Sequence, residues 1–206
     1  MTPDYSVFHN IGVSRETFSR LEIYVDQVRR WNPKINLVSK NSLDDVWDRH
    51  ILDSVQVFRC ADPFETWADL GSGGGFPGMV CAILALEEAP NARFTLVESD
   101  QRKSAFLRTV ARECGVACRV VSKRIEAADP LDCDVVSARA LTDLTRLMSF
   151  CDRHLNKTGT ALLPKGATWK KELEEAQEEW KFQVEPITSL TEPQAVVLKI
   201  KGVTRG

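Results

Sequence analysis

The segment best suited to bind a ligand is the glycine-rich run DLGSGGGFPG at residues 69–78. It follows a short apolar segment and precedes a helical one, so it is expected to form a strand-to-helix turn. Glycines at positions 71, 73 and 75 allow positive φ angles and let a ligand approach the backbone without a Cβ in the way. The sequence therefore predicts a binding site at this turn.

Two cofactors can use such a turn. Residues 73–78 match the dinucleotide pattern G-x-G-x-x-G, but in that fold the first glycine directly follows the strand. Here that residue is Gly71, and in its frame the third glycine position is Phe76. The alternative pattern D-x-G-x-G, residues 69–73, fits the strand end better and is typical of methyltransferases. S-adenosylmethionine has an ammonium group and a sulfonium, which favour a nearby carboxylate such as Asp69. We therefore favour this cofactor, with an NAD-dependent oxidoreductase as the alternative.

Three further residues are candidates for the same cofactor. Glu98 closes the next strand, where a carboxylate can accept hydrogen bonds from both ribose hydroxyls of an adenosine. A solvent-exposed acid at a strand end is the other interpretation. Ile125 and Glu126 follow the third strand, where an apolar side chain can flank the adenine and a backbone N–H can reach its ring nitrogen. From position alone, simple loop packing explains this pair almost as well.

The elements that carry these residues are those of an α/β fold. From Thr66 onward short apolar runs alternate with helical stretches, which is typical of βαβ units and a parallel sheet. The expected strands are 66–70, 94–98, 118–122, 134–138, 160–164, 181–187 and 195–201. Only about seven residues separate the last two, too few for a parallel crossover, so the seventh strand should run antiparallel to the sixth. A seven-stranded sheet with one reversed strand is typical of class I methyltransferases.

The helices are predicted from spacing and capping residues. In the core, one helix should start at Pro77, and another should run from the cap residue Asp100 to Gly115. The N-terminal region also reads as helical. Ser14 can cap a helix that ends before the breaker Asn32-Pro33, and a second helix is expected from Ser42 to Phe58.

Length and composition fit one globular domain. With 206 residues we expect a single S-adenosylmethionine-dependent methyltransferase domain over 1–206, made of a helical N-terminal extension (1–60) and an α/β core (61–206). No apolar run approaches the roughly 20 residues of a membrane helix, and the N-terminus does not resemble a signal peptide, so a cytoplasmic protein is expected. The six cysteines form no C-x-x-C pair and have no neighbouring histidines, which predicts neither metal site nor disulfides. The net charge of -2 gives no support for binding bare RNA, which would need local basic clusters.

Several fragments together resemble one family. They are WNPKINL (31–37), RHILDS (49–54), DLGSGGGFPG (69–78), VSARA (136–140) and LPKG (163–166). In order and spacing they are similar to the bacterial small-subunit (16S) rRNA guanine-N7 methyltransferases, the glucose-inhibited division protein B family. The resemblance runs from about residue 25 to the C-terminus and implies the class I fold drawn above. It also implies that the cofactor contacts the following residues: Gly71, Phe76, Ile125, Glu126 and Arg139.

The implied substrate is a guanine of 16S rRNA, presented in a small-subunit particle. Cytosine C5 methylation usually needs a cysteine after the fourth strand, and amino-group methylation usually needs an Asn/Asp-Pro-Pro-aromatic turn there; the sequence DVVSARA offers neither. Guanine N7 has a free lone pair and no proton at neutral pH, so its methylation needs only in-line placement. We therefore expect catalysis by positioning, with no general base among the catalytic residues.

Candidate substrate contacts come from three places. Arg139 could donate to guanine O6 or to a phosphate, or close the cofactor pocket, or pair with a surface acid. Lys165 could bind phosphate or be an exposed lysine, and Asn36 could lie at the cofactor mouth or stabilise a turn. His50 and Asp53, one helical turn apart, favour a network on a helix surface.

Other functions fit the same fold. These are methylation of a small molecule or a protein, and a non-catalytic role as an RNA-binding or ribosome assembly factor.

Overall fold

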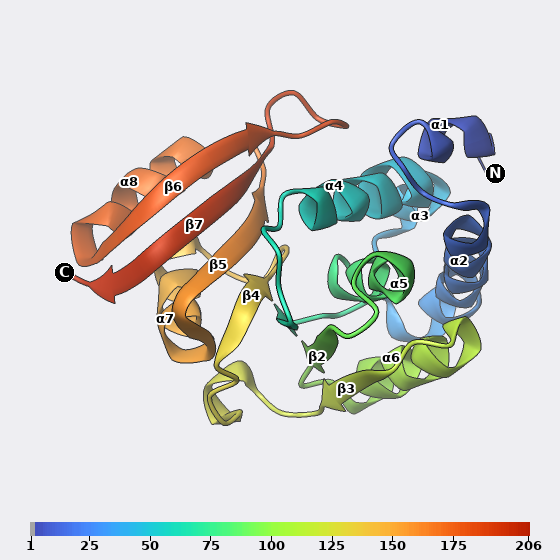
Figure 1. The fold of residues 1–206 in the computed structure, drawn as a ribbon, viewed down its shortest axis with the longest axis horizontal. Coiled ribbons are helices and arrows are strands. Elements are labelled where there is room, and N and C mark those ends of the chain that lie inside the picture. The colour runs from blue at the N-terminus through green and yellow to red at the C-terminus, as the bar shows by residue number, and fades with distance from the viewer. Residues whose placement is uncertain (1–2) are drawn as a thin grey trace.

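The computed structural model describes residues 3–206, which fold around one seven-stranded sheet in the order β3-β2-β1-β4-β5-β7-β6 (Figure 1). The strands are β1 (Thr66–Leu70), β2 (Arg93–Val97), β3 (Cys118–Val121), β4 (Cys133–Ser137), β5 (Leu155–Lys165), β6 (Trp180–Thr188) and β7 (Val196–Arg205). Strands β1 to β5 form a parallel sheet, whereas β7 is antiparallel to both of its neighbours, β5 and β6. The predicted α/β fold with a reversed seventh strand is confirmed.

Every predicted strand is present, and the largest differences are at β5 and β7. Strand β5 begins five positions before the apolar run at 160–164, and β7 continues beyond residue 201 to Arg205. The extension of β7 pairs with β6, where Trp180 lies opposite Arg205. Pairing with a neighbouring strand thus prolongs β7 past the segment that its apolar residues predict.

Helices cover both faces of the sheet. They are α1 (Tyr5–His9), α2 (Arg15–Ile35), α3 (Lys40–Asp44), α4 (Asp53–Arg59), α5 (Gly78–Glu88), α6 (Gln101–Cys114), α7 (Leu144–His154) and α8 (Trp169–Glu179), with a π-helical turn η1 (Trp47–Leu52) and a 3₁₀ turn η2 (Ile125–Ala127). Successive β1 side chains alternate between the faces: Trp67 packs with the core that contains α2, α4, α5 and α6, and Ala68 with the core that contains α7 and α8. No helix within residues 3–206 is long and apolar enough to cross a membrane.

The predicted caps of α6 are confirmed. The Asp100 carboxylate accepts hydrogen bonds from the N–H groups of Arg102 and Lys103, and Gly115 ends the helix with φ +69°. Helix α5 begins at Gly78, one residue after the position expected, with Pro77 as its cap.

The predicted end of the first N-terminal helix is wrong. Ser14 caps α2 as expected, accepting from the Thr17 N–H, but the helix continues through Pro33 to Ile35. Pro33 is exposed and lies in the last turn, so it gives up only the hydrogen bond to the carbonyl four residues earlier. The helix ends at Asn36, which adopts a left-handed conformation with φ +49°.

The second predicted helix, from Ser42 to Phe58, is divided into three segments: α3, η1 and α4. Trp47 and Ile51 of η1 are buried, so apolar spacing predicted helical structure correctly but did not reveal its change of pitch. Turns of π-helix are rare and occur often at functional sites.

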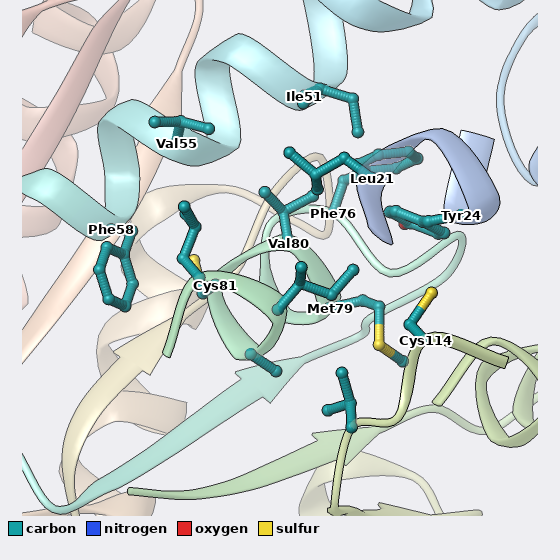
Figure 2. Packing of buried hydrophobic residues seen from close by; sticks show 14 of the residues in the cluster. Leu21, Tyr24, Ile51, Val55, Phe58, Phe76, Met79, Val80, Cys81 and Cys114 are labelled. Atoms are coloured by element: carbon teal, nitrogen blue, oxygen red, sulfur yellow. The ribbon is translucent and has the colours of Figure 1, made fainter. Parts of the chain in front are cut away.

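The N-terminal extension shares a core with the sheet. Leu21 and Tyr24 of α2, and Ile51 and Val55 of the η1–α4 segment, are buried in the same apolar cluster as Met79 and the rest of α5 (Figure 2). Residues 3–60 therefore pack directly on the helices that follow the glycine-rich turn.

The extension also holds the loop between β6 and β7. The Gln56 side chain donates to the carbonyl of Thr188 at 2.7 Å and accepts from the N–H of Leu190 at 2.9 Å. Both ends of the amide group are thus satisfied by one loop, although the loop follows more than 130 positions later in the chain.

We expect Gln56→Ala to lower the free energy of unfolding by about 1–3 kcal/mol, because both loop groups lose their partner. Urea unfolding measures this loss, and amide hydrogen exchange should show faster exchange at Leu190. Gln177→Ala, on the exposed side of α8, is the control and should change neither. Unchanged exchange at Leu190 would show that the amide does not anchor the loop.

Candidate cofactor and substrate cleft

A cleft of about 1060 Å³ lies at the carboxyl ends of the central strands, where ligands bind in open α/β sheets. Most of the predicted site residues line it: Gly71, Phe76, Glu98, Ile125, Glu126, Arg139 and Lys165. Asn36 does not line the cleft, but Leu37, Val38 and Ser39 next to it do. The structure therefore brings together residues that the sequence places far apart, including a part of the N-terminal extension.

The glycine-rich turn has the backbone that its sequence predicts. Gly71, Gly73 and Gly75 have φ angles of +66°, +53° and +93°, a region that side chains rarely allow. A Cβ at Gly71 would lie 2.6 Å from a methyl carbon of Leu141. The positive φ therefore favours glycine at this position, and any side chain there would also displace the Leu141 methyl group.

Glu98 is buried at the end of β2, and its carboxylate holds the turn. One oxygen accepts from the Gly73 N–H and the other from the Asp100 N–H, both at 2.8 Å. Each oxygen can accept a second hydrogen bond, so the group can still receive ribose hydroxyls. The sequence indicated the position of Glu98 but not its bonds to the turn and to the start of α6.

Asp69 does not lie where we expected. Its side chain is buried outside the cleft, where one oxygen accepts from the Ser137 hydroxyl at 2.7 Å. A Cβ at Gly78 would lie 2.4 Å from the Cβ of Asp69, so the carboxyl group packs directly under the start of α5. Burial raises the pKa of Asp69 to about 6, with hydrogen bonds and Arg139 acting against this rise. The expectation that Asp69 faces the cofactor's cationic groups is wrong, because alternate residues of β1 point to opposite faces and this one points into the core.

Arg139 is fixed by the N-terminal extension. Its guanidinium donates to the carbonyl of Arg49 at 3.1 Å and to Nδ1 of His50 at 2.5 Å, and lies 5.3 Å from the centre of the Phe76 ring. The His50 ring stacks on Phe76 with centroids 4.9 Å apart. The end of β4, the turn η1 and the glycine-rich run therefore meet at one point of the cleft.

His50 is not part of the helix-surface network that we expected with Asp53. An arginine only donates, so Nδ1 of His50 accepts and the ring is neutral. Burial, Arg139 and Arg49 lower the pKa of His50 to about 3. Asp53 instead pairs with the hydroxyl of Thr191 in the β6–β7 loop. Spacing one helical turn apart could not reveal this, because both partners come from later elements.

The turn after β3 offers an apolar side chain and a rim carboxylate. Ile125 is buried and lines the cleft, and its carbonyl lies 3.2 Å from Nε2 of the buried His154. Glu126 is exposed and forms an ion pair with Arg146 at 2.6 Å. A contact of Ile125 with adenine remains a prediction that this geometry allows.

Lys165 is neither the exposed lysine nor the free phosphate contact that we considered, and Asn36 does not lie at the cleft. The Lys165 side chain is only 9% exposed, and its ammonium group donates to Glu172 at 2.7 Å and to the Thr142 carbonyl at 3.0 Å. Its charge is thus neutralised within the fold. Asn36 is exposed but ends α2 in a left-handed conformation, which fits the turn-stabilising alternative.

The rim of the cleft carries cations that are available for a ligand. Arg49, Lys103, Lys123 and Arg124 line the cleft, and none of them forms an ion pair within the described part of the chain. Such groups suit the phosphates of a nucleic acid. The cleft rim is therefore locally basic although the whole chain has a net charge of -2.

Comparison with known proteins identifies the family. Residues 17–198 match the model of the family described as GidB, rRNA small subunit methyltransferase G. This chain belongs to that family. It is 64% identical to the ribosomal RNA small subunit methyltransferase G of Ruegeria pomeroyi, over all of this chain and 99% of the relative, and 46% identical to that of Paracoccus denitrificans, over 94% and 98%. It is thus a methyltransferase, as its sequence indicated.

Solved structures show the same fold at low sequence identity. A SAM dependent methyltransferase from Aquifex aeolicus aligns with a TM-score of 0.59 and 13% identity, over 78% of this chain and 95% of that one. A TehB-like SAM-dependent methyltransferase from Corynebacterium glutamicum aligns with a TM-score of 0.59 and 15% identity, over 88% and 99%. The arrangement of strands and helices is therefore that of S-adenosylmethionine-dependent methyltransferases.

The cleft fits S-adenosylmethionine, the cofactor of this family. The bare turn at Gly71 allows close approach, Glu98 can receive the ribose, and Ile125 offers an apolar surface for the adenine. The dinucleotide alternative is not supported by the family or by Phe76, which occupies the third glycine position and is buried.

We predict that Gly71→Val lowers the affinity for S-adenosylhomocysteine by roughly a hundredfold or more, because the branched side chain enters the turn. Gly115→Val is a matched control, since Gly115 has a similar φ of +69° but open space around it. Both variants should lose stability, and only the first should lose binding in titration calorimetry. Equal affinity of the two variants would contradict a cofactor site at Gly71.

The buried carboxyl of Asp69 should make stability depend on pH. Because the pKa of Asp69 is raised to about 6, the folded protein binds this proton more tightly than the unfolded chain. The stability that the protonated group provides is complete below about pH 4 and is lost as the pH rises through about 6.

The side chain in Asp69→Asn does not titrate. Between pH 4 and pH 7 the free energy of unfolding of this variant should therefore rise relative to that of the natural protein by up to about 3 kcal/mol. Urea unfolding of both proteins across this range measures the difference. Asp100→Asn is the control and should differ from the natural protein by a nearly constant amount over this range, because hydrogen bonds from Arg102 and Lys103 lower the pKa of Asp100 below 3.8. A constant difference between Asp69→Asn and the natural protein would mean that Asp69 ionises at its ordinary pKa.

Proposed function

We propose that this protein transfers a methyl group from S-adenosylmethionine to N7 of a guanine in 16S rRNA, and that it does so by positioning, without a general base. The proposal rests on the kinds of side chains that line the cleft. The chain that forms this cleft belongs to the rRNA small subunit methyltransferase G family. Within the described residues, no cysteine lines this cleft, so it offers no thiol for the C5 route.

Transfer to N7 fits the groups that are present. The N7 lone pair forms the new bond while the bond from carbon to sulfur breaks, and no proton leaves the base. The cofactor supplies the methyl group on a sulfonium. His50, at the cleft, has a pKa of about 3 and stays neutral near pH 7, so it does not take part as an acid. The chain therefore has to bind and orient rather than to move protons.

Arg139 has a place in this scheme as an anchor. Its hydrogen bonds to Arg49 and His50 direct the guanidinium toward η1. Methylation at N7 leaves the guanine with a positive charge, and a cation directly on the reacting nitrogen would oppose it. We propose that Arg139 shapes the pocket wall between Phe76 and η1 and does not contact N7.

The substrate is proposed to be RNA within a small-subunit particle. The unpaired rim cations Arg49, Lys103, Lys123 and Arg124 can contact phosphates, but they are few and the chain is acidic overall. Affinity for bare RNA grows with the number of phosphates that are neutralised, so a small patch gives weak binding. A particle that presents the guanine can supply further contacts, and the base must leave its stack to reach the cleft.

The test is methyl transfer from labelled S-adenosylmethionine to small subunits from a strain that lacks the gene. We expect label in 16S rRNA and strand cleavage at one guanine by chemistry specific for N7-methylguanine, with faster transfer to particles than to bare RNA. Gly71→Val is the control and should transfer no label. Label in protein, or in RNA that resists this cleavage, would overturn the N7 proposal, and ribosome binding without transfer would favour an assembly factor.

A further inference from the structure

Tyr24 connects the N-terminal extension to the glycine-rich turn. It lies in α2, its side chain is fully buried, and its hydroxyl donates a hydrogen bond to the carbonyl of Gly74. Figure 2 shows the ring beside Phe76, on the side of α2 that faces Met79. The centroids of the two rings are 5.1 Å apart. A residue outside the α/β core thus bonds to the backbone of the cofactor turn.

The glycine-rich turn packs closely against Tyr24. A Cβ at Gly75 would lie 2.6 Å from the Tyr24 hydroxyl oxygen and 2.9 Å from the Cβ of Met79. Gly75, with φ +93°, therefore lets the chain pass between Tyr24 and the first turn of α5. Burial raises the pKa of the Tyr24 hydroxyl well above its ordinary value, so it remains a donor throughout the physiological range.

A second contact from the extension supports the same turn. A Cβ at Gly74 would lie 3.3 Å from both the Cβ and the carbonyl oxygen of Leu37, so this segment lies directly on the turn. Leu37 is itself fixed, because the buried Asn32 side chain accepts from the N–H groups of Leu37 and Val38 at 2.7 and 2.9 Å. The extension therefore holds Gly74 by a hydrogen bond on one side and by packing on another.

These contacts matter because glycine has more backbone freedom than any other residue. A run of SGGG would sample many conformations if nothing outside it fixed the peptide groups. A ligand that must order such a loop binds less tightly than one that meets it already ordered. We propose that Tyr24 is a positioning residue that holds the glycine-rich turn in its binding form before the cofactor arrives, so that the N-terminal extension is part of the cofactor site.

The proposal concerns the cofactor turn and does not depend on which nucleotide is methylated. Tyr24→Phe is the test, because it removes the hydroxyl and keeps the ring against Phe76. Tyr5→Phe is the matched control: Tyr5 is the other tyrosine of the chain, and its hydroxyl donates to the Val13 carbonyl at 3.1 Å, between α1 and α2. Both variants lose one hydrogen bond to a backbone carbonyl, and only one of these bonds reaches the turn.

Three measurements separate positioning from general stability. Titration with S-adenosylhomocysteine should give an affinity reduced roughly tenfold for Tyr24→Phe and unchanged for Tyr5→Phe. Amide hydrogen exchange of the proteins without ligand should be faster for Tyr24→Phe alone at Gly73 and Gly75, whose N–H groups donate to Glu98 and to the Ser72 carbonyl. In methyl transfer, KM for the cofactor should rise while kcat and KM for the RNA substrate stay within about twofold.

Leu37→Ala provides a second variant that loosens the turn without changing the tyrosine. It should also speed exchange at Gly75, whose N–H donates to the Ser72 carbonyl, and weaken S-adenosylhomocysteine binding. The proposal is overturned if Tyr24→Phe binds and exchanges like the natural protein, or if Tyr5→Phe loses as much affinity. It is equally overturned if the variant has a lower kcat with unchanged cofactor affinity, because the hydroxyl would then act elsewhere.

Discussion

The cofactor site depends on one constraint: a turn that must lack side chains to admit a ligand has no side chains with which to hold itself. The fold meets this constraint from outside the turn. Glu98, at the end of the neighbouring strand, accepts from the Gly73 N–H, and Tyr24, in the N-terminal extension, donates to the Gly74 carbonyl. The first bond holds the peptide unit between Ser72 and Gly73, and the second holds the unit between Gly74 and Gly75. Neither unit can rotate freely, so the binding form is built into the protein.

The same constraint explains why the N-terminal extension shares a core with the sheet. Contacts from β2 reach the backbone around Gly74 from one side only. Helix α2 and the turn η1 supply the other side, through Tyr24 and through the stack of His50 on Phe76. The extension is in turn fixed to the far edge of the sheet, where Gln56 binds the β6–β7 loop. The cleft is thus enclosed by segments from both ends of the chain.

Features of the fold that depend on residues close in sequence were predicted correctly. The strands, the caps Ser14, Asp100 and Gly115, the reversed β7 and the bare turn at Gly71 follow from spacing, capping and loop length. Two of the errors concern contacts over long sequence separations, namely Asp69 bonded to Ser137 and His50 bonded to Arg139. The third is Pro33, which the helix accepts because it lies exposed in the last turn of α2. Glu98 illustrates both cases, since its position at the strand end was predictable and its hydrogen bond to Gly73 was not.

The charges of the cleft follow from the same packing. Lys165 is neutralised by Glu172, Arg139 is held by carbonyl and imidazole groups of η1, and His50 is neutral because it accepts from Arg139. Apart from Arg139, the cleft cations that form no ion pair within the described residues lie on the rim, where an RNA backbone would pass. A reaction that turns its substrate base into a cation is favoured in a pocket of this kind, since repulsion weakens with distance and with exposure to water. The rim cations can thus attract the RNA phosphates without lying next to the cationic product base. In a uniformly basic cleft the same charges would also repel that base.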